Sequence, residues 1–106
     1  MKNPNLVLRF IENAYTDDED ESEVVACFEL LKSEESSSVW SMSAPCEVRF
    51  PTGDLVKVVA EVTPYGNYLH VRHANKRLCS IKAGGAFEIM FLLPCGQGAY
   101  AELVLP

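Results

Sequence analysis

Residues 46–73 read CEVRFPTGDLVKVVAEVTPYGNYLHVRH, and their pattern is the clearest indication of the fold. Apolar and polar residues alternate along it, and the alternation stops at the turn sequences PTGD and PYGN. Successive side chains of a β-strand point to opposite faces, so the pattern predicts short strands with one buried face. Proline and glycine at the interruptions suit tight turns between antiparallel neighbours.

The same pattern continues along most of the chain. Strands are expected at 5–11, 39–44, 46–50, 55–62, 67–73, 77–82, 86–93 and 98–105. The separators are short, so neighbouring runs are expected to pair directly. We therefore predict an all-β fold, an antiparallel β-sandwich or small β-barrel of about eight to nine short strands. A length of 106 residues fits a single domain, 1–106.

The alternation also assigns side chains to the interior, because residues two apart share a face. The expected core comprises Leu6, Leu8 and Phe10; Cys46, Val48 and Phe50; Val56, Val58, Ala60 and Val62; Phe87, Ile89 and Phe91; and Ala101, Leu103 and Leu105. Leu69 and Val71 are expected beneath an outer face of the strand at 67–73.

Residues 20–32 fit two structures. As a helix they begin with a capping box, Asp20 with Glu23, and an α+β fold follows. The apolar stripe is then Val24, Cys27, Phe28 and Leu31. As a strand they place Val24, Ala26, Phe28 and Leu30 on one face and turn through 33–36 into a hairpin with 39–44. We adopt the strand and keep the helix as the alternative.

Negative charge is concentrated in one segment. The chain carries a net charge of -6, whereas residues 12–35 hold ten carboxylates against one lysine, a net of -9. A local negative field attracts basic proteins and repels phosphate backbones, so a basic protein partner is expected and nucleic acid is not. The carboxylates predicted to dock that partner lie within 17–35 and are Asp17, Asp18, Glu19, Asp20, Glu21 and Glu23. A solvated, self-repelling loop is the simpler interpretation of this segment.

Part of the acidic segment matches a calcium loop. Asp18, Asp20, Ser22 and Glu29 take positions one, three, five and twelve of the pattern. Glu23 replaces the glycine that such a loop needs for its sharp turn. His70 and His73 fall on opposite faces of their strand, so they do not form a joint site either. We expect no metal and no cofactor.

No secretory signal and no membrane span are recognised, which predicts a cytoplasmic protein that does not enter membranes. The four cysteines form no CxxC pair, so thiols are expected; disulfides would require export. Cys27, Cys46 and Cys79 are expected to be small buried thiols. Cys95, in a Pro-Cys-Gly turn, is expected to be exposed and is the candidate reactive thiol.

A ligand site is predicted at Tyr68, His70 and Arg72, which share one strand face. A phenol, an imidazole and a guanidinium in line could hold a carboxylate or phosphate group. Trp40, the only tryptophan, either packs in the core as a plug or is exposed as an aromatic surface that contacts the ligand. No nucleophile, base and orienter motif is present, so no catalytic residue is assigned.

Two functions remain. The first is a small acidic interaction module without catalysis that docks a basic partner through 17–35. The alternative is a small-molecule-binding barrel or modest enzyme with Tyr68, His70 and Arg72 beside an apolar pocket. A homodimer is expected if the C-terminal strand, at 98–105, lies on a sheet edge.

Overall fold

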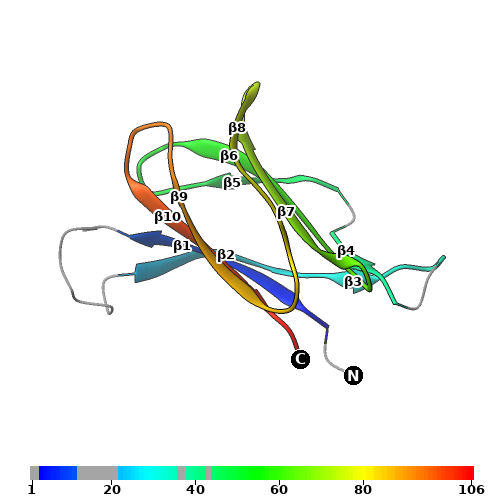
Figure 1. The fold of residues 1–106 in the computed structure, drawn as a ribbon. Helices are drawn as coiled ribbons and strands as arrows, with labels where there is room; N and C mark the ends of the chain where they lie inside the picture. The colour runs from blue at the N-terminus through cyan, green and yellow to red at the C-terminus, as the bar shows by residue number, and fades with distance from the viewer. Residues whose placement is uncertain (1–2, 12–21, 36–37, 43) are drawn as a thin grey trace.

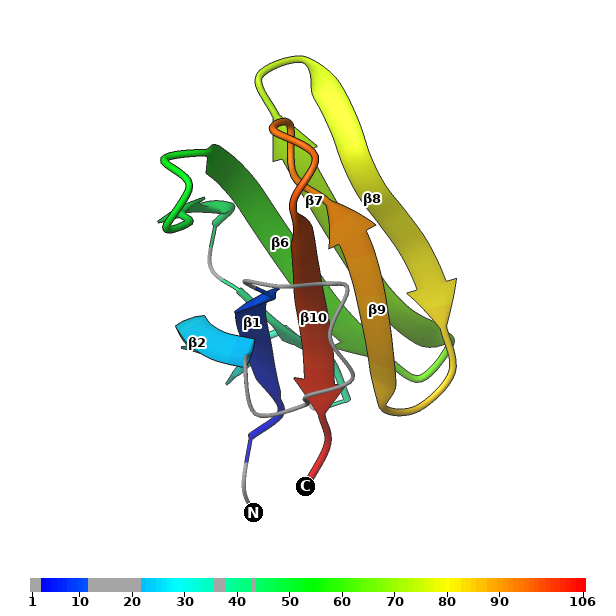
Figure 2. The same cartoon turned by 90° about the vertical axis from the view of Figure 1, so that its left-hand side faces the viewer.

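The computed structural model describes residues 3–11, 22–35, 38–42 and 44–106, and these form ten strands in two antiparallel sheets (Figure 1). The four-stranded sheet has the order β2-β1-β10-β9. Its strands are β1 (Asn5–Ile11), β2 (Ser22–Glu29), β9 (Phe87–Leu92) and β10 (Gly98–Val104). Figure 2 looks onto this sheet, with strands of the other sheet behind it.

The six-stranded sheet has the order β3-β4-β6-β7-β8, with β5 also paired to β6. Its strands are β3 (Leu31–Lys32), β4 (Trp40–Ser41), β5 (Cys46–Arg49), β6 (Leu55–Thr63), β7 (Gly66–His73) and β8 (Lys76–Ala83). Leu30 separates β2 from β3, so the chain passes from one sheet to the other at this point. The predicted all-β sandwich is confirmed.

The segment with two possible structures is a strand. Residues Ser22–Glu29 form β2 and pair with β1, so the helix alternative is wrong for the described part of 20–32. The hairpin predicted after it exists between β3 and β4, where Leu31 pairs with Ser41. It is much shorter than expected, because β4 is only two residues long.

One hydrophobic cluster draws side chains from both sheets. Its fully buried large residues are Phe50, Leu6, Leu8, Leu30, Leu69, Leu103, Val56, Val58 and Val71. Phe50 and Phe91 meet edge to face across the sandwich, with ring centroids 6.5 Å apart. Most of the predicted interior is therefore confirmed, and Leu30, Met42, Leu93 and Ala99 add to it.

A bulge in β2 changes which residues face the core. Leu8 pairs with Ala26, whereas Arg9 pairs with Val24, so Val25 is an extra residue in the ladder. Val24 is consequently turned outward and half exposed, so the prediction that it shares a face with Ala26, Phe28 and Leu30 is wrong. Simple alternation fails here because an inserted residue reverses the faces beyond it.

Two turns have the same construction and come from different sheets. In Phe50-Pro51-Thr52-Gly53-Asp54, the Gly53 N–H donates to Phe50 O and the Phe50 N–H to Asp54 O. Residues 93–97, with the sequence LPCGQ, repeat both bonds. Gly53 and Gly96 have φ angles of 93° and 95°, which favour glycine. The predicted turn chemistry is thus realised twice.

The C-terminal strand does not lie on an edge. β10 pairs with β1 on one side and β9 on the other, so the argument for a dimer through this strand fails. The edge strands of the four-stranded sheet are β2 and β9. Among the described residues, no helix is long and apolar enough to cross a membrane.

Candidate functional site

The predicted ligand residues on β7 do share one face. Tyr68, His70 and Arg72 alternate with the buried Leu69 and Val71, as the spacing predicts. This face is the outer side of the six-stranded sheet, away from the core. The strand pairing therefore holds the three side chains in a row directed outward.

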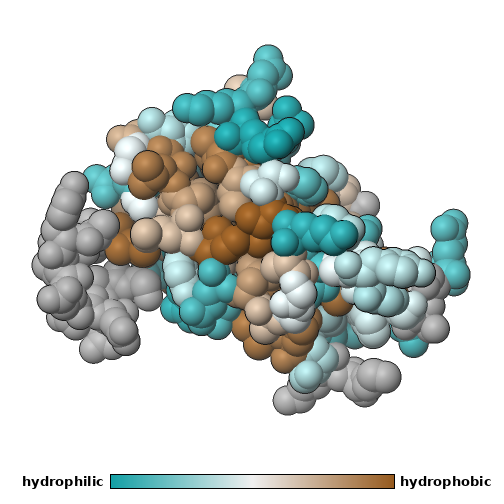
Figure 3. Space-filling model, viewed as in Figure 1, coloured by the Kyte–Doolittle hydropathy of each residue, from teal (hydrophilic) through white to brown (hydrophobic). Residues whose placement is uncertain are grey.

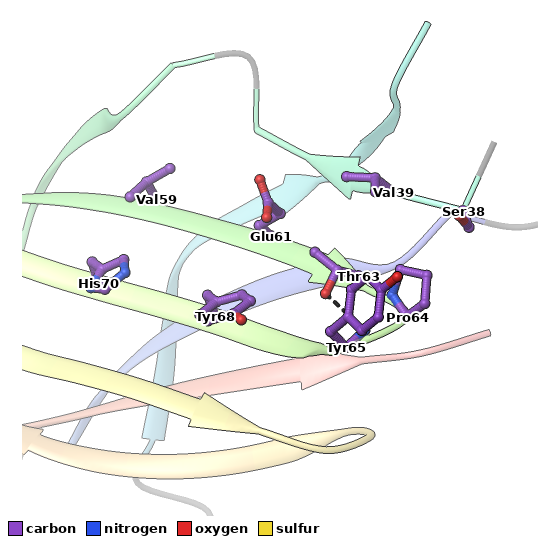
Figure 4. A pocket seen from close by; sticks show the side chains of 9 residues that line it. All are labelled: Ser38, Val39, Val59, Glu61, Thr63, Pro64, Tyr65, Tyr68 and His70. Carbon is purple, nitrogen blue, oxygen red and sulfur yellow. Dashed lines mark hydrogen bonds between the residues drawn. The ribbon is translucent and has the colours of Figure 1, made fainter. Parts of the chain in front are cut away.

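An open groove of about 650 Å³ runs along this face (Figure 4). Its lining residues are Ser38, Val39, Val59, Glu61, Thr63, Pro64, Tyr65, Tyr68 and His70. Tyr68 and His70 reach it, whereas Arg72 and Trp40 do not line it. The groove is thus built from two of the predicted ligand residues and from a carboxylate, Glu61, that the prediction omitted.

The turn between β6 and β7 positions Tyr65 at the end of the groove. The Thr63 hydroxyl donates to Gly66 O (2.6 Å) and accepts from the Tyr65 N–H (3.1 Å), as Figure 4 shows for the second bond. Tyr65 itself is 85% exposed. The Lys82 ammonium lies 5.6 Å from the centroid of the Tyr68 ring, a cation–π contact.

His70 is held by a neighbour on β8. Its Nδ1 is hydrogen-bonded to the Ser80 hydroxyl at 2.7 Å, and the two residues are directly opposed in the ladder. Both are exposed. A serine and a histidine at this distance are two parts of a nucleophilic site, but no third group among the described residues is hydrogen-bonded to this ring to orient it. We read the pair as a fixed hydrogen-bonding unit.

Bases lie opposite one another next to the groove. Lys57 of β6 opposes Arg72 of β7, and Arg72 opposes Arg77 of β8, which makes a row of three exposed bases. Within the described residues none of the three forms an ion pair. Glu47 opposes Lys57 on its other side, also without an ion pair. We call Lys57, Arg72 and Arg77 the basic row.

The acidic segment is only partly described. Asp17, Asp18, Glu19, Asp20 and Glu21 lie outside the described residues. Glu23 is exposed near the start of β2. Glu34 and Glu35 are exposed beyond β3. The described carboxylates of 17–35 are therefore in water, as predicted, at separate places in the fold.

The calcium pattern is contradicted by the strand. Ser22 and Glu29, two of its four positions, are the first and last residues of β2. Seven residues of extended chain separate them by about 23 Å, so they cannot hold one ion. Glu29 instead accepts a hydrogen bond from the Asn3 amide at 2.7 Å. In the described part of the chain no three His, Cys, Asp or Glu side chains gather as metal ligands.

Trp40 and Cys95 lie away from the groove lining. Trp40 pairs with Val62 and packs partly buried against the core, which is its predicted plug position. Cys95 is exposed, as predicted. Its thiol and the Thr52 hydroxyl hydrogen-bond the Asp54 carboxylate and lower the pKa of Asp54. A carboxylate neighbour is the opposite of the cationic setting that activates thiols.

The other cysteines are also free. Cys46 and Cys79 are partly buried, and burial raises the pKa of Cys79. Cys27 is exposed on the outer face opposite Val7, so its expected burial is wrong. As a strand residue, Cys27 points away from the side on which Ala26 and Phe28 pack.

The sequence argument missed Glu61, Lys57 and Arg77 because each comes from a strand other than β7. For Arg77 the sequence did contain a signal, the short hairpin loop after the strand at 67–73. The predicted turn near 74–76 makes Arg72 and Arg77 cross-strand neighbours once a two-residue hairpin loop is assumed. The partners on β6 require the register of a second hairpin as well.

No family model, no curated protein and no solved structure matches this chain.

Proposed function

We propose that this protein is a non-catalytic binding domain for a small molecule with an anionic group, held on the outer face of the six-stranded sheet. The observation that carries the proposal is the basic row, in which three bases oppose one another and none forms an ion pair with a described residue. Like charges directly opposed across strands destabilise a sheet. An anion above the middle base, Arg72, relieves that repulsion by contacting all three.

The chemistry of the row suits a carboxylate or a phosphate. A guanidinium presents a planar fork of donors that matches either group, and two of the three bases are arginines. Next to the row on β7 is His70, exposed and hydrogen-bonded to Ser80. Its second ring nitrogen is available to an additional oxygen of the ligand.

The groove restricts the chemistry of the part of the ligand that lies beyond the basic row. Tyr68 lies four residues from Arg72 along β7, about 13 Å in an extended strand. A ring or other flat group against Tyr68 and Tyr65 suits this end, since phenol faces stack well. Glu61 in the lining repels a second anion and accepts from a hydroxyl or amino group. The ligand is thus anionic at one end and neutral or basic at the other.

The test uses inorganic pyrophosphate as the anion probe and maps backbone amide shifts by NMR at low salt. We expect the shifts to centre on the strands that carry the basic row, and Arg72→Gln to weaken binding at least about tenfold. Arg49→Gln is the matched control, an exposed base on β5 that opposes Leu55. Shifts located elsewhere, or equal losses in the two variants, would reject the proposal.

A second candidate function is docking of a basic protein through 17–35. It is favoured by the exposure of every carboxylate that the structure describes in this segment, Glu23, Glu29, Glu34 and Glu35. Replacing Asp17, Asp18, Glu19, Asp20, Glu21 and Glu23 by their amides should then abolish a salt-dependent association recovered by pull-down. A partner retained equally by the neutralised variant would rule this function out.

We propose a cytoplasmic location for the protein under either candidate function. Four free cysteines fit a reducing compartment.

A further inference from the structure

β9 is the one long edge strand in the described fold without a feature that blocks pairing. Edge strands in natural sheets are protected by bulges, charges, proline or shortness. β2 contains a bulge and carries an acidic residue near each end, Glu23 and Glu29. β8 has a bulge beside Arg77 and carries three bases in all, and β3 is two residues long.

The sequence of β9, FEIMFL, is apolar at every position except Glu88 and has a regular register with β10. Met90 and Leu92 are each 64% exposed. Figure 3 shows hydrophobic surface gathered where Figure 1 places β9 and its neighbours. Phe87 and Ile89, on the inner side, are only partly covered.

The ladder defines which backbone groups of β9 are open. Next to the turn, the Leu93 N–H donates to Gln97 O, so this is a bonded pair. Bonded and non-bonded pairs alternate in an antiparallel ladder. Leu92, Met90 and Glu88 are therefore the residues whose N–H and C=O groups point away from β10. Their unpaired backbone groups lie in the plane of the sheet at its open edge, and their exposed side chains stand beside that edge on the outer face.

We infer that this edge binds a second copy of the chain, β9 against β9 in antiparallel orientation, about a twofold axis at Met90. The open groups are spaced symmetrically about Met90, so in this register Met90 bonds to Met90 of the other copy and Glu88 to Leu92 of the other copy. The two sheets join into one eight-stranded sheet. This inference does not depend on the proposed function.

The charge of the strand is compatible with this occupant. Each Glu88 opposes a leucine, and the two carboxylates lie four residues apart along the strands, about 14 Å. That separation exceeds the Debye length of about 8 Å at physiological ionic strength, so their repulsion is weak. The partly covered Ile89 comes opposite Phe91 of the other copy, which extends apolar contact on the inner side.

Mass in solution tests the association. Sedimentation equilibrium should show a dimer for the native chain and a monomer for Met90→Lys, which places a charge on the edge. Val104→Lys is the matched control, an exposed apolar residue on the same face but on the interior strand β10, and it should remain a dimer. A monomeric native chain, or equal loss in both variants, overturns the inference.

Cross-linking tests the register, in a background where the exposed Cys27 and Cys95 are replaced by serine. Opposed residues in a bonded pair have Cα atoms about 5.5 Å apart, within the range for a disulfide. Met90→Cys should therefore form a covalent dimer on oxidation, and Leu92→Cys, whose partner is Glu88, should not. Equal or preferential cross-linking of Leu92→Cys overturns the proposed pairing.

Discussion

The outer faces of the two sheets differ sharply although they cover the same core. The face of the four-stranded sheet leaves apolar side chains in water at Val24, Met90, Leu92 and Val104. The face of the six-stranded sheet carries the basic row and the groove, whose lining mixes polar and apolar side chains. Solvent-exposed strand positions are free of packing requirements, so the shared core does not dictate this difference.

The charged side chains on the two faces also differ in their ion-pair partners. On the four-stranded sheet, Arg9 and Glu102 form an ion pair at 3.8 Å, with both side chains about one-third exposed. The bases of the basic row have no such partner among the described residues. Glu88 directly opposes Glu102 on the four-stranded sheet, and Arg9 partly balances that pair, whereas no described carboxylate forms an ion pair with the basic row. This contrast supports assigning protein pairing to the first and anion binding to the second.

The largest expected effect comes from the core that both faces share. Leu8 is fully buried on the inner side of β1, and Leu92 is mostly exposed on the outer side of β9. Leu8→Ala should lower the free energy of unfolding by about 2–5 kcal/mol, because it leaves a cavity. Leu92→Ala should change it by less than about 0.5 kcal/mol in the monomer. Urea unfolding measures both; similar losses would mean that inner and outer sides are misassigned.

A smaller effect of opposite sign is expected in the basic row. Arg72 faces a base on each side, and like charges opposed across strands cost roughly 0.2–1 kcal/mol per pair. Arg72→Gln should therefore raise the free energy of unfolding of the ligand-free protein while weakening anion binding. Arg49→Gln, which faces Leu55, should leave stability unchanged. Destabilisation by Arg72→Gln would show that the guanidinium already has a stabilising role in the fold.

The architecture could be predicted because local signals agreed with one another. Alternation marked the strands, and the Pro-x-Gly sequences at 51–53 and 94–96 marked turns that formed as expected. The interior followed from the same alternation wherever the ladder is regular. At Val25 the ladder contains a bulge, and no residue type in β2 predicts it.

The candidate site could be predicted only along a single strand. Tyr68, His70 and Arg72 share a face because of their spacing, which is a local property. Glu61 and the flanking bases become neighbours through the registers of β6 and β8, which depend on long-range pairing. The open edge at β9 depends on the order of strands in the sheet, and one sequence does not determine that order.

The smallest expected effect is confined to alkaline solution and to the four-stranded face. The Glu88 carboxylate, in hydrogen-bonding reach of the phenol, raises the pKa of Tyr100 from 10.0 to about 12, with burial and the charge of Glu102 as further causes. A raised pKa in the folded state means that the contribution to stability is complete below pH 10 and is lost as the pH rises towards about 12.

NMR titration of the Tyr100 ring carbons measures this pKa directly. Glu88→Gln keeps a hydrogen-bond acceptor but removes the largest source of negative charge, so the pKa of Tyr100 should move back towards 10.0. An unchanged pKa in this variant would assign the shift to burial and to the charge of Glu102. If the pKa does follow the charge, the Glu88 carboxylate interacts with the Tyr100 phenol on the outer face of the four-stranded sheet. The Glu88 side chain is then held away from the open edge at which β9 is inferred to pair.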